Sequence, residues 1–169
     1  ALGERFEIAS NCFKRFACGI VIHPNIHGCV QLASAHALKG EAIERIDLKV
    51  HPLVLELTGK KTPRIGLEAK FSVYHACAAG VLYRRADEAE FRDAVVARPE
   101  VIALRDRITA TADEKIGEAL ADVTITQTRW ETPFAVDPFA VGLRQKLDLL
   151  VAVTKTIGEV AGVSPRPPS

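Results

Sequence analysis

The sequence predicts an α+β domain, a two-layer sandwich in which helices cover one face of a mainly antiparallel sheet. Two observations favour this class. Stretches in which β-branched and polar residues alternate are interleaved with stretches whose apolar residues recur at helical spacing. The chain has 169 residues, of which 48% are hydrophobic and 25% charged, so it is long enough to bury a core.

The first half of the chain carries two strand signals separated by a helix. A short strand is expected at residues 5–8, where polar and apolar side chains alternate. A helix then begins at His23, because Pro24 suits the first helical position, and Gly40 ends it. Isoleucine, leucine and valine alternate with charged residues over 43–50 and predict a second strand there.

The second half is expected to be mostly helical before it returns to the sheet. The longest helix is predicted at residues 67–85, and shorter ones at 87–96 and 99–107. The apolar face of the longest helix carries Leu67, Phe71, Ala78 and Leu82. Two threonine-rich stretches, 108–113 and 121–129, are predicted to pair as antiparallel strands.

The chain is expected to have three parts. Residues 1–130 form the α+β domain, and residues 131–162 form a proline-interrupted connection followed by a terminal helix at 141–160. Residues 163–169 are expected to be a disordered tail. The sequence contains no methionine, even at position 1, so we expect it to be part of a longer protein.

The charge balance argues against several classes of partner. The 22 basic and 21 acidic residues leave a formal net charge of +1, which gives no broad positive field for nucleic acid or a membrane surface. No signal pattern is visible, and no apolar run approaches the roughly 18 residues that span a bilayer. We therefore expect a cytoplasmic protein.

The cysteines carry no metal or disulfide signal. Cys12, Cys18, Cys29 and Cys77 form no C-x-x-C pair, and their spacing matches neither a zinc ribbon nor a disulfide framework. We interpret them as buried thiols in a reducing compartment.

Two adjacent cations, Lys14 and Arg15, stand between Phe13 and Phe16. One interpretation is a pair of solvated surface cations whose aliphatic stems lie across apolar neighbours. The other is a clamp for carboxylates, because arginine offers a planar fork and lysine a point charge. The phenylalanines would lower the local dielectric constant and strengthen such contacts.

His23 is expected at the start of a helix, where backbone N–H groups and the helix dipole favour an anion. It is either a capping residue or a group that hydrogen-bonds a substrate or carries a proton near neutral pH. His27 would share its helix face, but no third ligand stands at a recognisable spacing, so we expect no metal site.

Three polar side chains of the helix predicted at 67–85 are further candidates for substrate binding. Lys70 and Tyr74 share one stripe of that helix, and His75 lies about 100° round from Tyr74. These side chains either form an exposed edge or direct hydrogen-bonding groups into a cleft.

The sequence lacks the G-x-S-x-G, G-x-x-x-x-G-K-[ST], G-x-G-x-x-G and H-E-x-x-H motifs. It does contain FKRFACGIVIHPNIHG, GLEAKFSVYHACAAGVL and FRDAVVARPEVIALRDRI in that order. Together these segments resemble the C-terminal domain of the MmgE/PrpD family, which includes 2-methylcitrate dehydratase, cis-aconitate decarboxylase and iminodisuccinate epimerase. The resemblance runs from about residue 5 to about residue 128.

The resemblance implies a two-domain enzyme in which a helical domain and this smaller lid domain enclose the active site. Members act on small polycarboxylates without metal or organic cofactor. Lys14 and His23 match the family's lysine and histidine and are expected to be catalytic, with Arg15, Lys70, Tyr74 and His75 in substrate binding. Where decarboxylase-like members have a tyrosine after the A-[KR]-x-S motif, this chain has His75 in ungapped register, which disfavours decarboxylation.

The leading hypothesis is therefore a cofactor-independent lyase, a dehydratase of propionate catabolism acting on 2-methylcitrate or a related acid. The alternatives are an isomerase or epimerase of a related dicarboxylate, and a noncatalytic domain that binds an anion or mediates oligomerisation. The expected partners are a small polycarboxylate, the helical domain of the same enzyme and a second copy in a homodimer. The isolated chain is expected to have little or no activity.

Overall fold

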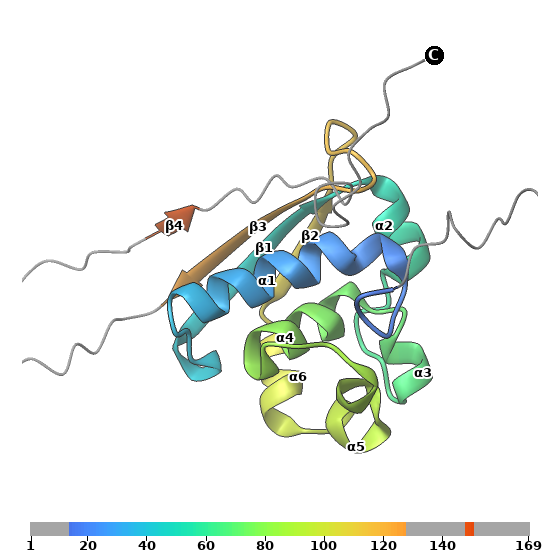
Figure 1. Cartoon of the computed structure of the whole chain (residues 1–169), viewed down its shortest axis with the longest axis vertical. Helices are drawn as coiled ribbons and strands as arrows, with labels where there is room; N and C mark the ends of the chain where they lie inside the picture. Colours follow the sequence, from blue (N-terminus) through green and yellow to red (C-terminus); the bar gives the residue numbers. More distant parts are fainter. Residues whose placement is uncertain (1–13, 128–147, 151–169) are drawn as a thin grey trace, which may run out of the picture.

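The computed structural model describes residues 14–127 and 148–150, in which helices pack against one small sheet (Figure 1). The α+β class predicted from the sequence is confirmed. The elements are, in chain order and with η marking short 3₁₀ helices, η2 (Ile20–Ile22), α1 (His23–Ala35), η3 (Gly40–Ala42), β1 (Ile43–Val50), α2 (Pro52–Thr58), α3 (Gly66–Ala69), α4 (Val73–Tyr83), η4 (Glu88–Phe91), α5 (Asp93–Val96), α6 (Pro99–Arg105), β2 (Ile108–Ala112), β3 (Ala121–Gln127) and β4 (Asp148–Leu150).

The sheet is mixed, with the strand order β2-β1-β3-β4. β1 runs parallel to β2 and antiparallel to β3, and β4 runs antiparallel to β3. The prediction that residues 108–113 and 121–129 pair with each other is therefore wrong, because β1 lies between these two strands. Of the three strand pairings in the described residues, two are antiparallel and one is parallel.

Strand β1 is the centre of the sheet, and its buried residues are spaced irregularly. Its inward side chains are Ile43, Ile46, Leu48 and Val50. The step of three from Ile43 to Ile46 coincides with a register shift between Ile43 and Arg45 in the pairing with β3. A β-bulge adds one residue to a strand and so shifts the alternation by one position, which lets both Ile43 and Ile46 face the core.

Helix α1 begins at His23, as the His-Pro pair predicts, but it ends at Ala35 and not at Gly40. The chain turns at Ala37, which has a φ of 48°. The N–H of Leu38 donates to the Ala33 carbonyl at 3.0 Å, and this pattern is a Schellman C-cap. Ala37 therefore takes the left-handed conformation that ends the helix, and the predicted terminator Gly40 lies three residues beyond it.

The single helix predicted at residues 67–85 is two helices, α3 and α4, with a break before Ser72. The Ser72 hydroxyl accepts a hydrogen bond from the His75 N–H at 3.1 Å and caps α4. The break rotates the first turn out of register with the rest. Leu67 and Phe71 are consequently 67% and 51% exposed, so the predicted continuous apolar face is wrong at these positions.

Of the other predicted helices, one is present, one is divided and one contains a strand. The helix predicted at 87–96 is divided into η4 and α5, and η4 is closed by a capping box between Asp87 and Glu90. The helix predicted at 99–107 is present as α6. Strand β4 lies inside the stretch predicted as the helix 141–160, where its backbone pairs with the free edge of β3. The rest of that stretch, the strand at 5–8 and the tail at 163–169 lie outside the described residues.

The core lies where α1 and α4 pack together over the sheet, with α1 also against β3 (Figure 1). Close approach between the helices occurs at Gly80, whose missing side chain would lie 3.4 Å from Ile26. Among the described residues, no helix is long and apolar enough to cross a membrane.

Candidate functional site

The candidate site is built on the segment 14–19, which is tied to both ends of α4. The Ala17 N–H donates to the Ala86 carbonyl at 3.2 Å, and the Gly19 N–H donates to the Lys70 carbonyl at 3.1 Å. Gly19 also lies close to α2, since a Cβ there would be 3.1 Å from the Thr58 methyl group. These contacts hold the segment against the domain just before it enters α1.

Phe16 anchors this segment in the core and leaves its neighbours in solvent. The Phe16 ring is 6% exposed, whereas Lys14 and Arg15 are exposed. The Arg15 guanidinium carbon lies 5.7 Å from the centroid of the Phe16 ring, within the range of a cation–π contact. The Lys14 ammonium lies 3.4 Å from the Cys18 carbonyl oxygen, which is a long hydrogen bond.

His23 is the first residue of α1, and its ring is held by Phe16. The two ring centroids are 5.3 Å apart at an interplanar angle of 84°, an edge-to-face arrangement. The residue is only 8% exposed, and its Nε2 is buried without a hydrogen-bond partner within the described part of the chain. Buried polar atoms usually have a hydrogen-bond partner, so this Nε2 has the capacity to bond a group outside the described residues.

Burial lowers the pKa of His23 below its ordinary value, and the charge of Lys14 lowers it further. The backbone groups of Cys18 and Phe16 act in the opposite direction on this pKa. The imidazole is therefore neutral at neutral pH. Lys14 and His23 thus lie near the same short segment, with the Lys14 ammonium 3.4 Å from the Cys18 carbonyl oxygen and its charge acting on the His23 ring.

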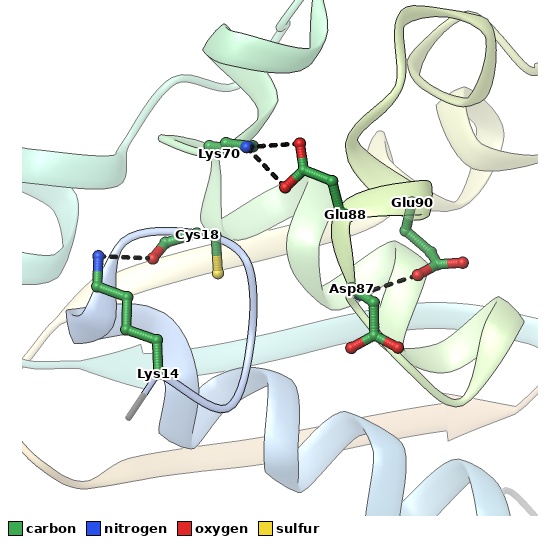
Figure 2. Close-up of polar contacts among 6 residues, drawn as sticks. All are labelled: Lys14, Cys18, Lys70, Asp87, Glu88 and Glu90. Atoms are coloured by element: carbon green, nitrogen blue, oxygen red, sulfur yellow. Dashed lines mark hydrogen bonds and ion pairs between the residues drawn. The ribbon is translucent and has the colours of Figure 1, made fainter. Parts of the chain in front are cut away.

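Cys18 lies on the same segment as Lys14, and the charges of both Lys14 and Lys70 act on its thiol (Figure 2). Burial raises the pKa of Cys18 to about 12, although the charges of Lys14 and Lys70 lower it. A thiol with such a pKa is protonated at neutral pH and is a poor nucleophile. Cys18, Cys29 and Cys77 are all buried free thiols, in agreement with the interpretation of the cysteines; Cys12 lies outside the described residues.

Lys70 stands at the end of α3 and is paired with a carboxylate that the sequence does not point to. Its ammonium lies 3.0 and 2.9 Å from the two carboxylate oxygens of Glu88, the first residue of η4 (Figure 2). The Lys70 side chain is 30% exposed and that of Glu88 is 73% exposed. The pair therefore lies at the surface, on the same part of the domain as segment 14–19.

Tyr74 and His75 are placed differently from the cations. Tyr74 is 9% exposed, with the Lys61 ammonium 5.8 Å from its ring centroid, and burial raises the pKa of its hydroxyl. His75 is completely buried, and its Nε2 lies 2.9 Å from the Glu90 carbonyl oxygen. Burial lowers the pKa of His75. The structure therefore places His75 in the core and does not bring it to Lys14 and His23.

Two further residues of the site carry no sequence signal. Glu88 is eighteen positions from its partner Lys70, so no local spacing links them. Asn25, in the first turn of α1, is fully buried, and neither amide atom has a hydrogen-bond partner among the described residues. Nothing in the helical pattern distinguishes such an asparagine from an exposed one.

The donor set around segment 14–19 is cationic and neutral, which suits carboxylates better than metal ions. Across residues 14–127 and 148–150, no group of three or more histidine, cysteine, aspartate or glutamate side chains is arranged to hold a metal ion.

The model of the MmgE/PrpD C-terminal domain matches residues 16–136, and the chain belongs to this family. A search of curated proteins finds no match. The match includes the segment of His23, the break before Ser72 and all three of the longer strands.

Proposed function

We propose that this chain is the C-terminal domain of a cofactor-independent lyase, a dehydratase that acts on a small polycarboxylate such as 2-methylcitrate. The family supports an enzyme of the dehydratase and lyase type. The observation that carries the proposal is that segment 14–19 holds both the Lys14 ammonium, 3.4 Å from the Cys18 carbonyl oxygen, and the neutral His23 ring, packed on Phe16. One group offers a positive charge, and the other offers an uncharged ring nitrogen.

The chemistry of dehydration gives each group a role. Loss of water removes a proton from the carbon beside a carboxylate and a hydroxyl group from the adjacent carbon. Negative charge develops next to the carboxylates, and a fixed ammonium stabilises it. Lys14 would bind a substrate carboxylate, with Arg15 as a second cation. His23 would hydrogen-bond the hydroxyl that leaves, because its Nε2 has no other partner within the described residues.

The other candidates support this arrangement. Lys70 would be a second ammonium for a substrate with several carboxylates. Tyr74 and His75 are buried, so we propose that they hold α4 in position beneath the site. The helical domain of the same enzyme would supply the remaining acid–base groups and close the site.

The surface around the cations supports such a covering domain. Its exposed large apolar side chains are Ile20, Leu57, Ile65, Leu67 and Phe71. They lie on η2, α2 and the segment around α3, and Gly19 brings η2 against both others through Thr58 and Lys70. Apolar side chains gathered in this way are typical of a surface that another protein surface covers.

The experiment compares Lys14→Ala with wild type in the complete enzyme, using 2-methylcitrate and the ultraviolet absorbance of the unsaturated product. Removing the ammonium is expected to lower kcat/KM by about 10²-fold or more. Lys49→Ala, on the exposed side of β1, is the matched control and is expected to have no effect. The isolated chain is expected to be inactive. An unchanged rate for Lys14→Ala would remove this residue from the mechanism.

The same samples separate the other candidate functions. An epimerase or isomerase would exchange a substrate proton with solvent deuterium without forming the unsaturated acid, since proton abstraction starts both reactions. A noncatalytic domain would bind the acid without either change. Binding without turnover or exchange in the complete protein would overturn the proposal of a lyase.

A further inference from the structure

The charges of Lys14 and Lys70 both act on Cys18, but the two ammonium groups have different hydrogen-bond partners. The Lys14 ammonium contacts only a backbone carbonyl oxygen, at 3.4 Å, among the described residues. The Lys70 ammonium is held by both oxygens of the Glu88 carboxylate, at 3.0 and 2.9 Å. A carboxylate is the group that the proposed substrate would bring to this lysine. Figure 2 shows the Glu88 carboxylate against the Lys70 ammonium, where on the proposed function a substrate carboxylate would bind.

The position of Glu88 allows it to be replaced. Glu88 is 73% exposed and Lys70 is 30% exposed, so water reaches the pair. Ion pairs of this kind stabilise a fold by about 1 kcal/mol or less, because solvent screens the attraction and two long side chains lose freedom. No other hydrogen bond of the Glu88 side chain is present among the described residues, so its carboxylate is free to turn away.

The backbone joins Lys70 to the segment that carries Lys14, and the charges of both lysines act on the Cys18 thiol. The Lys70 carbonyl accepts the hydrogen bond from Gly19, directly after Cys18, so α3 and segment 14–19 are joined at this residue. A substrate with two or more carboxylates could then bind Lys14 through one and Lys70 through another. A monocarboxylate could not displace Glu88 and hold Lys14 at the same time.

We propose that Glu88 is a specificity-determining residue, an internal carboxylate that holds Lys70 until a second carboxylate of the substrate replaces it. This inference rests on the proposed function, because it takes a polycarboxylate as the ligand. Glu88 competes with every anion for Lys70 and so lowers its affinity. An anion that also binds Lys14 gains a second contact and can still displace Glu88. It acts through Lys70 and takes no part in the chemical step.

The experiment measures the Kd of 2-methylcitrate by calorimetry in the complete enzyme, comparing wild type, Glu88→Gln and Glu68→Gln. Freeing Lys70 is expected to lower the Kd about two- to fivefold, the range that an exposed ion pair allows. Glu68 pairs with Lys60 at 2.7 Å and also accepts from the Arg64 N–H at 2.7 Å, so Glu68→Gln removes the same charge from a neighbouring ion pair and keeps an oxygen for the Arg64 bond. The Kd is expected to be unchanged in this control.

A second background separates competition from a structural effect. In Lys70→Ala the Kd is expected to rise, and adding Glu88→Gln is expected to have no further effect. A merely structural role of Glu88 would weaken binding when it is replaced. If wild type binds 2-methylcitrate but Glu88→Gln leaves the Kd unchanged or raises it, the inference fails while the proposed function stands. If wild type binds no polycarboxylate, both fail.

Discussion

The contact between Phe16 and His23 can be tested by replacing each residue and then both. Phe16→Leu keeps an apolar side chain but removes the ring, and His23→Gln removes the imidazole. The ring centroids are 5.3 Å apart at 84°, within the 4.5–7 Å range of edge-to-face pairs, which contribute about 0.5–1.5 kcal/mol beyond area burial. We therefore expect a coupling free energy of about 1 kcal/mol between the two substitutions.

The assay is urea unfolding of the 169-residue chain above the ordinary histidine pKa of about 6.5, so that His23 is neutral in both states. The contact of Phe16 with Arg15 is lost in both arms of the cycle and cancels. Phe91, which packs on His75 with centroids 5.5 Å apart, gives the control. Phe91→Leu combined with His23→Gln should be additive. Coupling below about 0.3 kcal/mol between Phe16 and His23 would refute the argument.

Two further predictions concern the stability of the same chain. Gly66→Ala should lower the free energy of unfolding by about 3 kcal/mol, because a Cβ there would lie 1.9 Å from the Phe91 carbonyl oxygen, whereas Gly117→Ala should change it by less than about 1 kcal/mol. Equal effects in urea unfolding would contradict this. Burial lowers the pKa of His75, so the unfolded chain binds a proton at this residue more readily than the folded chain. The free energy of unfolding should therefore be at its full value above about pH 6.5 and fall as the pH drops below it. His75→Asn should flatten the profile, leaving the part due to His23, and an unfolding free energy that rises on acidification would show the sign to be wrong.

Local patterns predicted the parts of the fold that local chemistry determines. The His23-Pro24 pair places the start of α1, and the alternating residues over 43–50 place β1, because both signals depend on neighbouring residues. Lys14 and His23 are nine positions apart and are joined by a short segment that turns back on itself. Their proximity could be expected from the sequence for this reason.

The parts that failed depend on contacts distant in the chain. β2 pairs with β1 in parallel. The connection between these strands contains all the helices from α2 to α6, so no local turn signal predicts the pairing. The break between α3 and α4 depends on the Ser72 cap, and serine is not an unusual residue inside a helical pattern. The Lys70–Glu88 pair could not be predicted for the same reason, since it joins two elements that only the packing of the domain brings together.

On the proposed function, the exposure of Lys14 gives a covering surface an energetic role. Two charges about 4 Å apart attract by roughly 1 kcal/mol in water and by about 4 kcal/mol at the effective dielectric constant of a partly covered site. Covering the exposed Lys14 would therefore add about 3 kcal/mol to its contact with a substrate carboxylate, a factor of about 10². The exposed apolar side chains on and beside α3, such as Leu67 and Phe71, would exclude water once a covering surface is in place. On the proposed function, the same lysine thus contributes little in the isolated chain and much in the closed enzyme.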